Sequence, residues 1–310
     1  MVNDVITPHL DINPNVKKAM DCRSPIIALE STIICHGMPY PKNVQTAIQA
    51  EQIARDNGVI PATIAIINGR LKVGLTENEI EYLGKLGNKV PKVSRRDLPF
   101  IISQKNNGAT TVAATMIIAA MVKIKVFATG GIGGVHRDVN QSFDVSADLQ
   151  ELSQTSMAVV CSGIKSVLDI PKTLEYLETH GVSVIGFKTK NMPAFYNTDS
   201  GYSVDYTISD TKNIAETMKI KWDLQQKGGI LITNPIPKEY SLPSSEINEV
   251  INAALSEMKE KNITGKETTP FLLSKIAEIT EGKSLESNIQ LVLNNVSLGS
   301  KIASCFNQLH

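Results

Sequence analysis

Short apolar runs alternate with helix-like segments along most of this chain, and this alternation constrains the fold more than any other feature. Continuous runs such as Pro25–Leu29 and Thr63–Ile67 suit strands that are buried on both faces. Strands that alternate with helices imply crossover connections, and therefore a largely parallel sheet with helices on both of its faces. The sequence thus predicts an α/β fold.

The length of 310 residues permits one or two domains. No linker and no internal repeat divides the chain, so we expect a single catalytic domain over residues 23–310. Residues 1–22 are expected to form an N-terminal arm, either loose or containing a short helix. Trp222, the only tryptophan, lies in a predicted helix over Thr211–Gln226 and is interpreted as a core residue.

Charge and cysteine usage exclude several classes of protein. The 31 basic residues balance 31 acidic ones, so no overall field attracts nucleic acid or an anionic membrane. The four cysteines have no paired spacing, which argues against a disulfide framework or a zinc knuckle. The N-terminus resembles neither a signal nor a transit peptide, and no apolar run approaches the roughly 20 residues that span a bilayer. We expect a cytoplasmic protein with a small-molecule partner.

Two chemically active residues follow predicted strands directly. Glu30 ends the run Pro25–Leu29, where a carboxylate is costly unless it is paired or functional. Lys165 follows the β-rich run Met157–Val160 and a Ser-Gly turn. A lysine that loses hydration there can become a nucleophile and form an imine. The plain alternatives are a salt-bridged or capping glutamate and a solvated lysine. Active residues of parallel sheets gather at the carboxyl ends of strands, which favours the functional interpretation.

Three further segments suggest ligand binding. The glycine-rich stretch Gly130–Gly134 leads to His136 and Arg137 and could hold a phosphate, although a flexible turn would need no ligand. It is not a dinucleotide fingerprint, because the third glycine of that motif falls on His136. The basic stretch Lys89–Asp97 could form an anion site or a solvated charge run. Ser146 is predicted to cap a helix from Ala147, which leaves Asp144 just outside to face a metal or a substrate; simple acidic capping is the alternative.

The C-terminal helical segment carries amides and a hydroxyl within an otherwise apolar pattern. Ser287, Asn288, Asn294 and Asn295 are predicted to lie in this helix, from Leu285 to about Asn307. A buried amide needs hydrogen-bond partners or a ligand.

Taken together, separated motifs resemble the pseudouridine-5′-phosphate glycosidase family, which includes proteins named for indigoidine synthesis. The resemblance covers about residues 22–305. The motifs are Ala28–Thr32, His36–Pro41, the glycine loop ending in His136 and Arg137, Asp144–Leu149, Ser162–Ser166, Asn234–Pro237, Thr269–Leu273, and Ser284 and Leu285 with Asn288.

The resemblance implies a three-layer α/β/α sandwich, a homotrimer and a divalent metal, typically Mn²⁺. It implies reversible cleavage of pseudouridine 5′-phosphate into uracil and ribose 5-phosphate. By match of motif, Lys165 would be the covalent nucleophile and Glu30 the proton donor. Asp144 would serve the metal. The substrate would be bound by Lys92, Val112, Ser146, Ala147 and Asp148, with Asn288 on the uracil and His136 as a further candidate for the phosphate.

The implied chemistry suits these residue types. A C-glycosidic bond has no leaving heteroatom, so carbon must receive the proton, and a buried glutamic acid can supply it. Two alternatives remain open: a lysine-dependent sugar-phosphate aldolase, which needs no base pocket around Asn288, and a sugar-phosphate-binding regulator, which would turn over no substrate.

Overall fold

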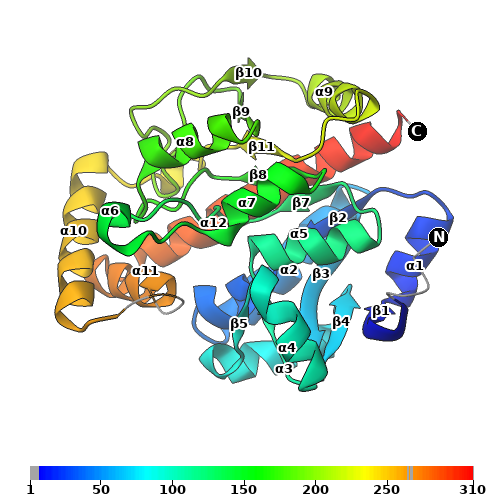
Figure 1. Cartoon of the computed structure of the whole chain (residues 1–310), viewed down its shortest axis with the longest axis horizontal. Helices are drawn as coiled ribbons and strands as arrows, with labels where there is room; N and C mark the ends of the chain where they lie inside the picture. Colours follow the sequence, from blue (N-terminus) through cyan, green and yellow to red (C-terminus); the bar gives the residue numbers. More distant parts are fainter. Residues whose placement is uncertain (1–6, 264, 266–267, 310) are drawn as a thin grey trace.

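The computed structural model describes residues 7–263, 265 and 268–309 (Figure 1). Within these residues, nine strands form one sheet in the order β1-β4-β3-β2-β7-β8-β11-β9-β10. All neighbouring pairs are parallel except β3 with β4, which is antiparallel. The predicted α/β fold with a largely parallel sheet is therefore confirmed. The strands are β1 (Leu10–Ile12), β2 (Ile26–Leu29), β3 (Ile60–Ile67), β4 (Arg70–Val73), β7 (Val126–Ala128), β8 (Ala158–Cys161), β9 (Ser183–Phe187), β10 (Tyr206–Ile208) and β11 (Ile230–Thr233).

A small separate sheet joins β5 (Lys92–Val93) and β6 (Ala109–Thr110) in parallel. The α-helices are α1 (Pro14–Asp21), α2 (Lys42–Asp56), α3 (Glu77–Leu86), α4 (Leu98–Ser103), α5 (Val112–Met121), α6 (Val139–Ser142), α7 (Ala147–Gln154), α8 (Ile170–Thr179), α9 (Thr211–Asp223), α10 (Ser244–Glu260), α11 (Thr268–Ile279) and α12 (Lys283–Asn307). Short 3-10 turns occupy Thr7–His9, Gly87–Lys89, Arg95–Asp97 and Lys238–Tyr240, and a π-helical turn occupies Ile33–Gly37.

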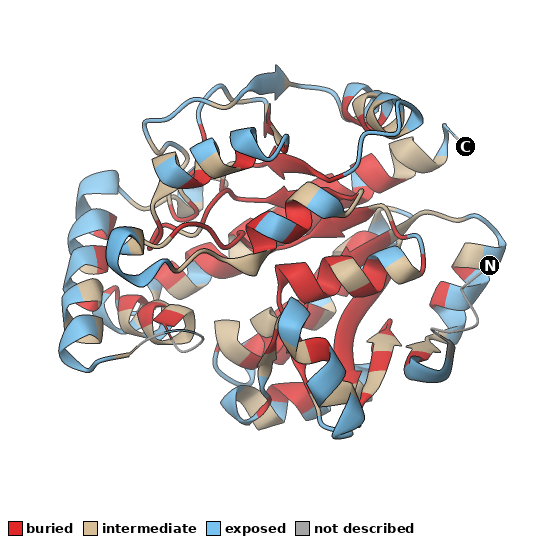
Figure 2. Ribbon diagram, viewed as in Figure 1, coloured by how far each residue is buried: buried red, intermediate tan, exposed pale blue. Residues whose placement is uncertain are grey.

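The helices form layers on both faces of the sheet, which completes the three-layer sandwich. In Figure 1, α5, α7 and α8 lie in front of the strands and α12 passes behind them. Helix α12 contacts β2, β7 and β8 and has α2 and α9 as its neighbours. Gly299 permits this close approach, because a Cβ there would lie 2.8 Å from Cδ1 of Ile27. Figure 2 shows the buried residues concentrated in the central strands and in the helix faces against them.

Apolar composition explains why the central strands are the most buried elements. Strands β8 and β11 are buried along their whole length, as expected of parallel strands covered on both faces. A hairpin turn at Asn68 and Gly69 joins β3 to β4, and both residues have positive φ. A capping box of Thr76 and Glu79 begins α3.

The N-terminal segment contains a short helix, which is one of the two alternatives we expected, and also a strand that we did not expect. Strand β1 pairs with β4 at the edge of the sheet, and α1 follows with Val16 buried. Arg70 donates hydrogen bonds to the carboxylate of Asp11 and to the carbonyl of Leu10, which fixes this edge. The segment is thus attached to the sheet through β1. The first six residues of the expected arm lie outside the described residues. No helix among the described residues is long and apolar enough to cross a membrane.

Candidate active site

Glu30 and Lys165 line the same narrow cavity at the carboxyl edge of the sheet. Glu30 follows β2, and Lys165 lies in the loop after β8. The strand between them, β7, is followed by Thr129 and the glycine loop. Strand order alone therefore brings the two residues together, as the position of both at strand ends predicts. The cavity is lined by Glu30, Thr32, Ile33, His36, Gly37, Lys92, Thr129, Gly130, Gly131, Lys165, Phe195, Thr269, Pro270, Leu273 and Asn288.

The carboxyl group of Glu30 is held from both sides. Thr129 donates a hydrogen bond to Oε1, and Thr32 donates one to Oε2. Burial raises the pKa of Glu30 above its usual value, because a carboxylate loses its hydration there; the positive charge of Lys165 and the hydroxyl of Thr129 oppose the shift without reversing it. Such a group retains its proton more readily than an exposed glutamate, as a proton donor requires.

The loop that carries Lys165 is attached to the glycine loop by backbone hydrogen bonds. The amide of Ser162 donates to the carbonyl of Gly130 at 2.8 Å, and the amide of Lys165 donates to the carbonyl of Ile132 at 3.2 Å. Gly163 has φ of +91°, and a Cβ at this position would lie 2.2 Å from the carbonyl oxygen of Pro193. Glycine is therefore required for the turn that directs Lys165 into the cavity.

Asp148 joins the first turns of two helices beside the glycine loop. Its Oδ1 accepts a hydrogen bond from the amide of Ala113 at 3.0 Å, and its Oδ2 accepts one from the amide of Gly133 at 2.9 Å. Ser146 caps α7, as predicted, by accepting from the amide of Asp148 at 3.2 Å. Val112 and Ala147 are the first residues of α5 and α7. Two helix N-termini thus meet here, an arrangement that suits an anionic group.

Lys92 supplies a positive charge to the cavity. It opens β5 and lies within electrostatic range of Glu30, whose pKa it lowers slightly against the effect of burial. Its side chain is half-buried. A cation on the cavity wall can bind an anionic group of a ligand.

His136 and Asp144 lie together in the loop after the glycines, but they are not among the residues that line the cavity of Glu30. His136 Nε2 lies 3.7 Å from Oδ2 of Asp144, and the amide of His136 donates to the carbonyl of Asp144 at 3.1 Å. In the described part of the chain, no three His, Cys, Asp or Glu side chains gather as metal ligands. The half-exposed carboxylate of Asp144 fits an ion that keeps most of its waters, as Mg²⁺ does when held by one or two carboxylates.

Helix α12 presents its polar residues to different partners. Ser287 donates to the carbonyl of Tyr240 at 2.7 Å, and Asn294 donates to the carbonyl of Pro235 at 3.1 Å. Asn288 lines the cavity and is 6% exposed, and its side-chain amide makes no hydrogen bond within the described residues. Its amide remains available to a ligand.

Asn295 is the most connected of these amides. Its Nδ2 donates to the carbonyls of Thr129 at 2.8 Å and Gly130 at 3.3 Å, and lies 3.1 Å from Oγ of Ser162. Its Oδ1 accepts from Nδ2 of Asn234 at 3.1 Å. One fully buried side chain thereby ties together the carboxyl ends of β7, β8 and β11, the strand ends that carry the site.

Sequence reasoning did not single out Thr32, Thr129 or Phe195. Thr129 directly follows β7, the neighbour of β2. The rule that active residues gather at the carboxyl ends of parallel strands, which located Glu30, would also have found Thr129. Phe195 comes from an irregular loop whose path no local pattern reveals. Its φ is +62°.

Comparisons with known proteins agree with this arrangement. Residues 15–305 match the family described as indigoidine synthase A like protein. A protein of Clostridium botulinum (strain Langeland / NCTC 10281 / Type F) named pseudouridine-5′-phosphate glycosidase is 59% identical over 299 residues, which cover 96% of this chain and 97% of that protein. The protein of the same name from Escherichia coli (strain K12) is 53% identical over 305 residues, covering 98% of each.

Two solved structures share the fold at 33% sequence identity and a TM-score of 0.88. One is the prealnumycin C-glycosynthase AlnA in complex with ribulose 5-phosphate, with 97% of both chains covered. The other is an indigoidine synthase A-like protein from Thermotoga maritima, with 96% of this chain and 97% of that one covered. The predicted resemblance is confirmed: this chain belongs to the indigoidine synthase A-like family, together with proteins named pseudouridine-5′-phosphate glycosidase.

Proposed function

We propose that this protein is an enzyme that reversibly cleaves the C–C glycosidic bond of pseudouridine 5′-phosphate, giving uracil and ribose 5-phosphate. The observation that carries the proposal is the pair of a buried glutamic acid and a lysine in one cavity, in a chain more than half identical to proteins named for this reaction. The name and bound pentose phosphate of the structural neighbour AlnA also fit a C-glycosidic substrate.

Glu30 acts as the proton donor. Its proton goes to C5 of the uracil ring, and the electron pair of the breaking C1′–C5 bond remains with that ring. The hydrogen bonds from Thr32 and Thr129 fix the carboxyl group, and burial raises its pKa and so favours the protonated form. Without protonation of carbon, the leaving group would be a carbanion.

Lys165 acts as the nucleophile. After it loses a proton, its amine forms a bond to C1′ as the C1′–O4′ bond of the ribose ring breaks and O4′ takes up a proton. The nitrogen lone pair then forms the C=N bond of an imine as the C1′–C5 bond breaks and its electron pair leaves with uracil. The resulting imine takes up one water molecule, which releases ribose 5-phosphate and restores the amine. The backbone hydrogen bonds of the Lys165 loop hold the amine toward the cavity.

The phosphate of the substrate is bound beside the first turns of α5 and α7. Val112, Ser146, Ala147 and Asp148 lie at these helix starts, and Lys92 supplies a positive charge. Asp148 would act mainly through the backbone, since both of its carboxylate oxygens accept hydrogen bonds from amides. His136 is a second cation candidate for the phosphate.

Asn288 recognises the uracil ring. Its amide offers both a donor and an acceptor, which match the alternating carbonyl and N–H groups of uracil. Thr269, Pro270 and Leu273 add an α11 wall to the same cavity. A lysine-dependent aldolase would not need an open amide at this position, so Asn288 favours the glycosidase.

Asp144 would hold Mn²⁺ or a similar divalent ion, one per subunit, with water filling the other positions. When bound, such an ion orders water and polarises oxygen atoms of the sugar. We further propose a homotrimer in the cytoplasm, supported by the family resemblance and, for the compartment, by four unpaired cysteines.

An ultraviolet assay of uracil release from pseudouridine 5′-phosphate tests the proposal directly. We expect turnover in the wild type and none in Lys165→Ala. Borohydride added during turnover should add the mass of one reduced ribose phosphate adduct, and peptide mapping should place it on Lys165.

Lys190→Ala is the matched control, because Lys190 is an exposed lysine that does not line the cavity. This variant should still release uracil, and borohydride should still trap the ribose phosphate adduct on Lys165. Full uracil release by Lys165→Ala would end the covalent mechanism. Release of an aldehyde from ketose phosphates, with no uracil from pseudouridine 5′-phosphate, would favour the aldolase.

A further inference from the structure

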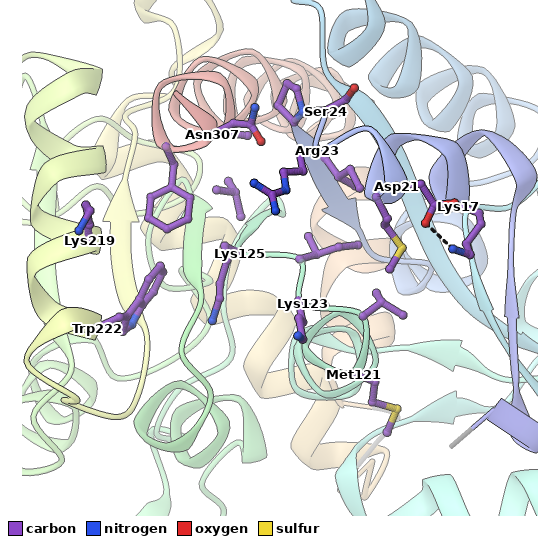
Figure 3. A pocket seen from close by; sticks show the side chains of 18 of the residues that line it. Lys17, Asp21, Arg23, Ser24, Met121, Lys123, Lys125, Lys219, Trp222 and Asn307 are labelled. Atoms are coloured by element: carbon purple, nitrogen blue, oxygen red, sulfur yellow. Dashed lines mark hydrogen bonds and ion pairs between the residues drawn. The ribbon is translucent and has the colours of Figure 1, made fainter. Parts of the chain in front are cut away.

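A second cavity lies at the amino ends of the strands, on the side of the sheet opposite to Glu30. It has a volume of about 670 Å³ and is lined by the first residues of β2 and β7, Ile26 and Val126, together with the C-terminal ends of α1, α5, α9 and α12 (Figure 3). Glu30 and Thr129 follow the other ends of those same two strands. The cavity is therefore separate from the catalytic one.

The residues that line this cavity carry more positive than negative charges. Lys17 pairs with Asp21, and Lys219 pairs with Asp223. Arg23, Lys123 and Lys125, which also line the cavity, form no ion pair with any described residue. In Figure 3 these three side chains lie between Trp222 on one side and the Lys17–Asp21 pair on the other.

The positions of Arg23 and Lys123 are not explained by helix capping. Each is the left-handed residue after a helix, with φ of +52° and +64°, where glycine is usual. Backbone amides already satisfy the helix ends: Ser24 donates to the carbonyl of Ala19 at 2.8 Å, and Ile124 donates to that of Ala119 at 3.0 Å. These two positions therefore carry long cationic side chains, although the helix ends need no side-chain cap and the backbone conformation favours glycine.

Lys125 adds to the unbalanced charge. Burial lowers the pKa of its amine, and the neighbouring Lys123 lowers it further. Its Nζ donates to the carbonyl of Ser156 at 3.2 Å and lies 4.9 Å from the centroid of the Trp222 ring. An anion in the cavity would stabilise this cluster.

One wall of the cavity is aromatic. The rings of Trp222 and Phe306 meet edge to face with centroids 5.5 Å apart. The indole N–H of Trp222 donates to the carbonyl of Gly228 at 3.2 Å, which fixes the ring. Met20 and Met121 extend the apolar surface. A flat ring suits this wall, and a phosphate suits the adjacent cations.

We propose that this cavity is a second, non-catalytic site that binds a nucleoside phosphate, with the base against Trp222 and Phe306 and the phosphate between Arg23 and Lys123. The inference goes beyond the proposed reaction and does not depend on it.

Trp222 is the only tryptophan, so its fluorescence reports on this cavity directly. We expect uridine 5′-monophosphate or adenosine 5′-monophosphate to change the emission saturably, with weaker binding at higher salt. The double variant Arg23→Gly/Lys123→Gly should bind at least about tenfold more weakly, which corresponds to about 1.4 kcal/mol. Glycine suits both backbone positions, so this variant should fold and keep its uracil release.

Lys105→Gly is the matched control. Lys105 is a left-handed lysine after α4, with φ of +55°, and it does not line the cavity. Its replacement should leave nucleotide binding unchanged. The proposal is overturned if no nucleotide changes the emission saturably, if Arg23→Gly/Lys123→Gly binds as the wild type does, or if inorganic phosphate or uridine alone binds as tightly as the nucleotide.

Discussion

Replacing Asn295 by leucine tests whether one buried amide positions the catalytic strand ends. Leucine has a similar volume but cannot hydrogen-bond. Asn295→Leu would leave three buried groups without the partners they have now: the carbonyl of Thr129 at 2.8 Å, the side-chain amide of Asn234 at 3.1 Å and the hydroxyl of Ser162 at 3.1 Å. The carbonyl of Gly130 would keep its bond from the amide of Ser162.

An unsatisfied buried polar group costs about 1–3 kcal/mol, so three such groups should lower the free energy of unfolding by about 3–9 kcal/mol. That is a large part of the 5–15 kcal/mol typical of a folded domain. Because Thr129 bonds to Glu30, and Ser162 begins the loop of Lys165, kcat of the folded variant should also fall by about ten- to a hundredfold.

Chemical denaturation and uracil-release kinetics measure the two effects separately. Asn294→Leu is the matched control, since Asn294 is the adjacent residue and has one hydrogen bond, to the carbonyl of Pro235. It should cost about 1 kcal/mol and leave kcat nearly unchanged. If Asn295→Leu is no less stable than Asn294→Leu and retains full kcat, the positioning role is wrong.

Three further predictions concern the acid and the metal. Glu30→Gln should lower kcat by about 10²- to 10⁴-fold. Burial raises the pKa of Glu30 and so favours its protonated form. The free energy of unfolding of the wild type, relative to that of Glu30→Gln, should therefore be highest below the ordinary carboxyl pKa and should decline as pH rises toward the raised pKa. A difference in stability that does not change with pH would contradict this. Thr129→Val removes a hydroxyl that lowers the pKa of Glu30, so the alkaline limb of the pH–kcat profile should move to higher pH; a move to lower pH would refute the assignment. Chelation should reduce wild-type turnover, and added Mn²⁺ should restore it; in Asp144→Ala restoration should require more Mn²⁺, whereas equal Mn²⁺ dependence would exclude Asp144 as a ligand.

The convergence of Glu30 and Lys165 could be predicted because it depends on a regular feature. Glu30 directly follows a strand and Lys165 lies in the loop after another, and parallel strands place their carboxyl ends along one edge. The capping role of Ser146 was also predictable, since a capping serine acts on amides within its own helix. Local patterns of this kind need no knowledge of the rest of the chain.

Contacts between distant segments could not be predicted in the same way. The sequence shows that Asn295 is polar in an apolar helix, but its partners lie 61 to 166 positions away. Strand β1 has three residues, too few for a recognisable periodicity, and pairing with β4 defines it. Trp222 has a large apolar side chain, which suggested a core residue. Its half-buried ring forms one wall of a cavity.

Helix α12 connects the two requirements of the proposed reaction. Asn288 and Asn295 are two helical turns apart, so their side chains project from the same face. Asn288 meets the cavity with its amide unbonded, while Asn295 is bonded to the strand ends beneath it. The proposed base recognition and the position of the proposed acid therefore depend on one helix. A displacement of α12 along its axis would disturb both together, and the packing of the helix against β2, β7 and β8 opposes such a displacement.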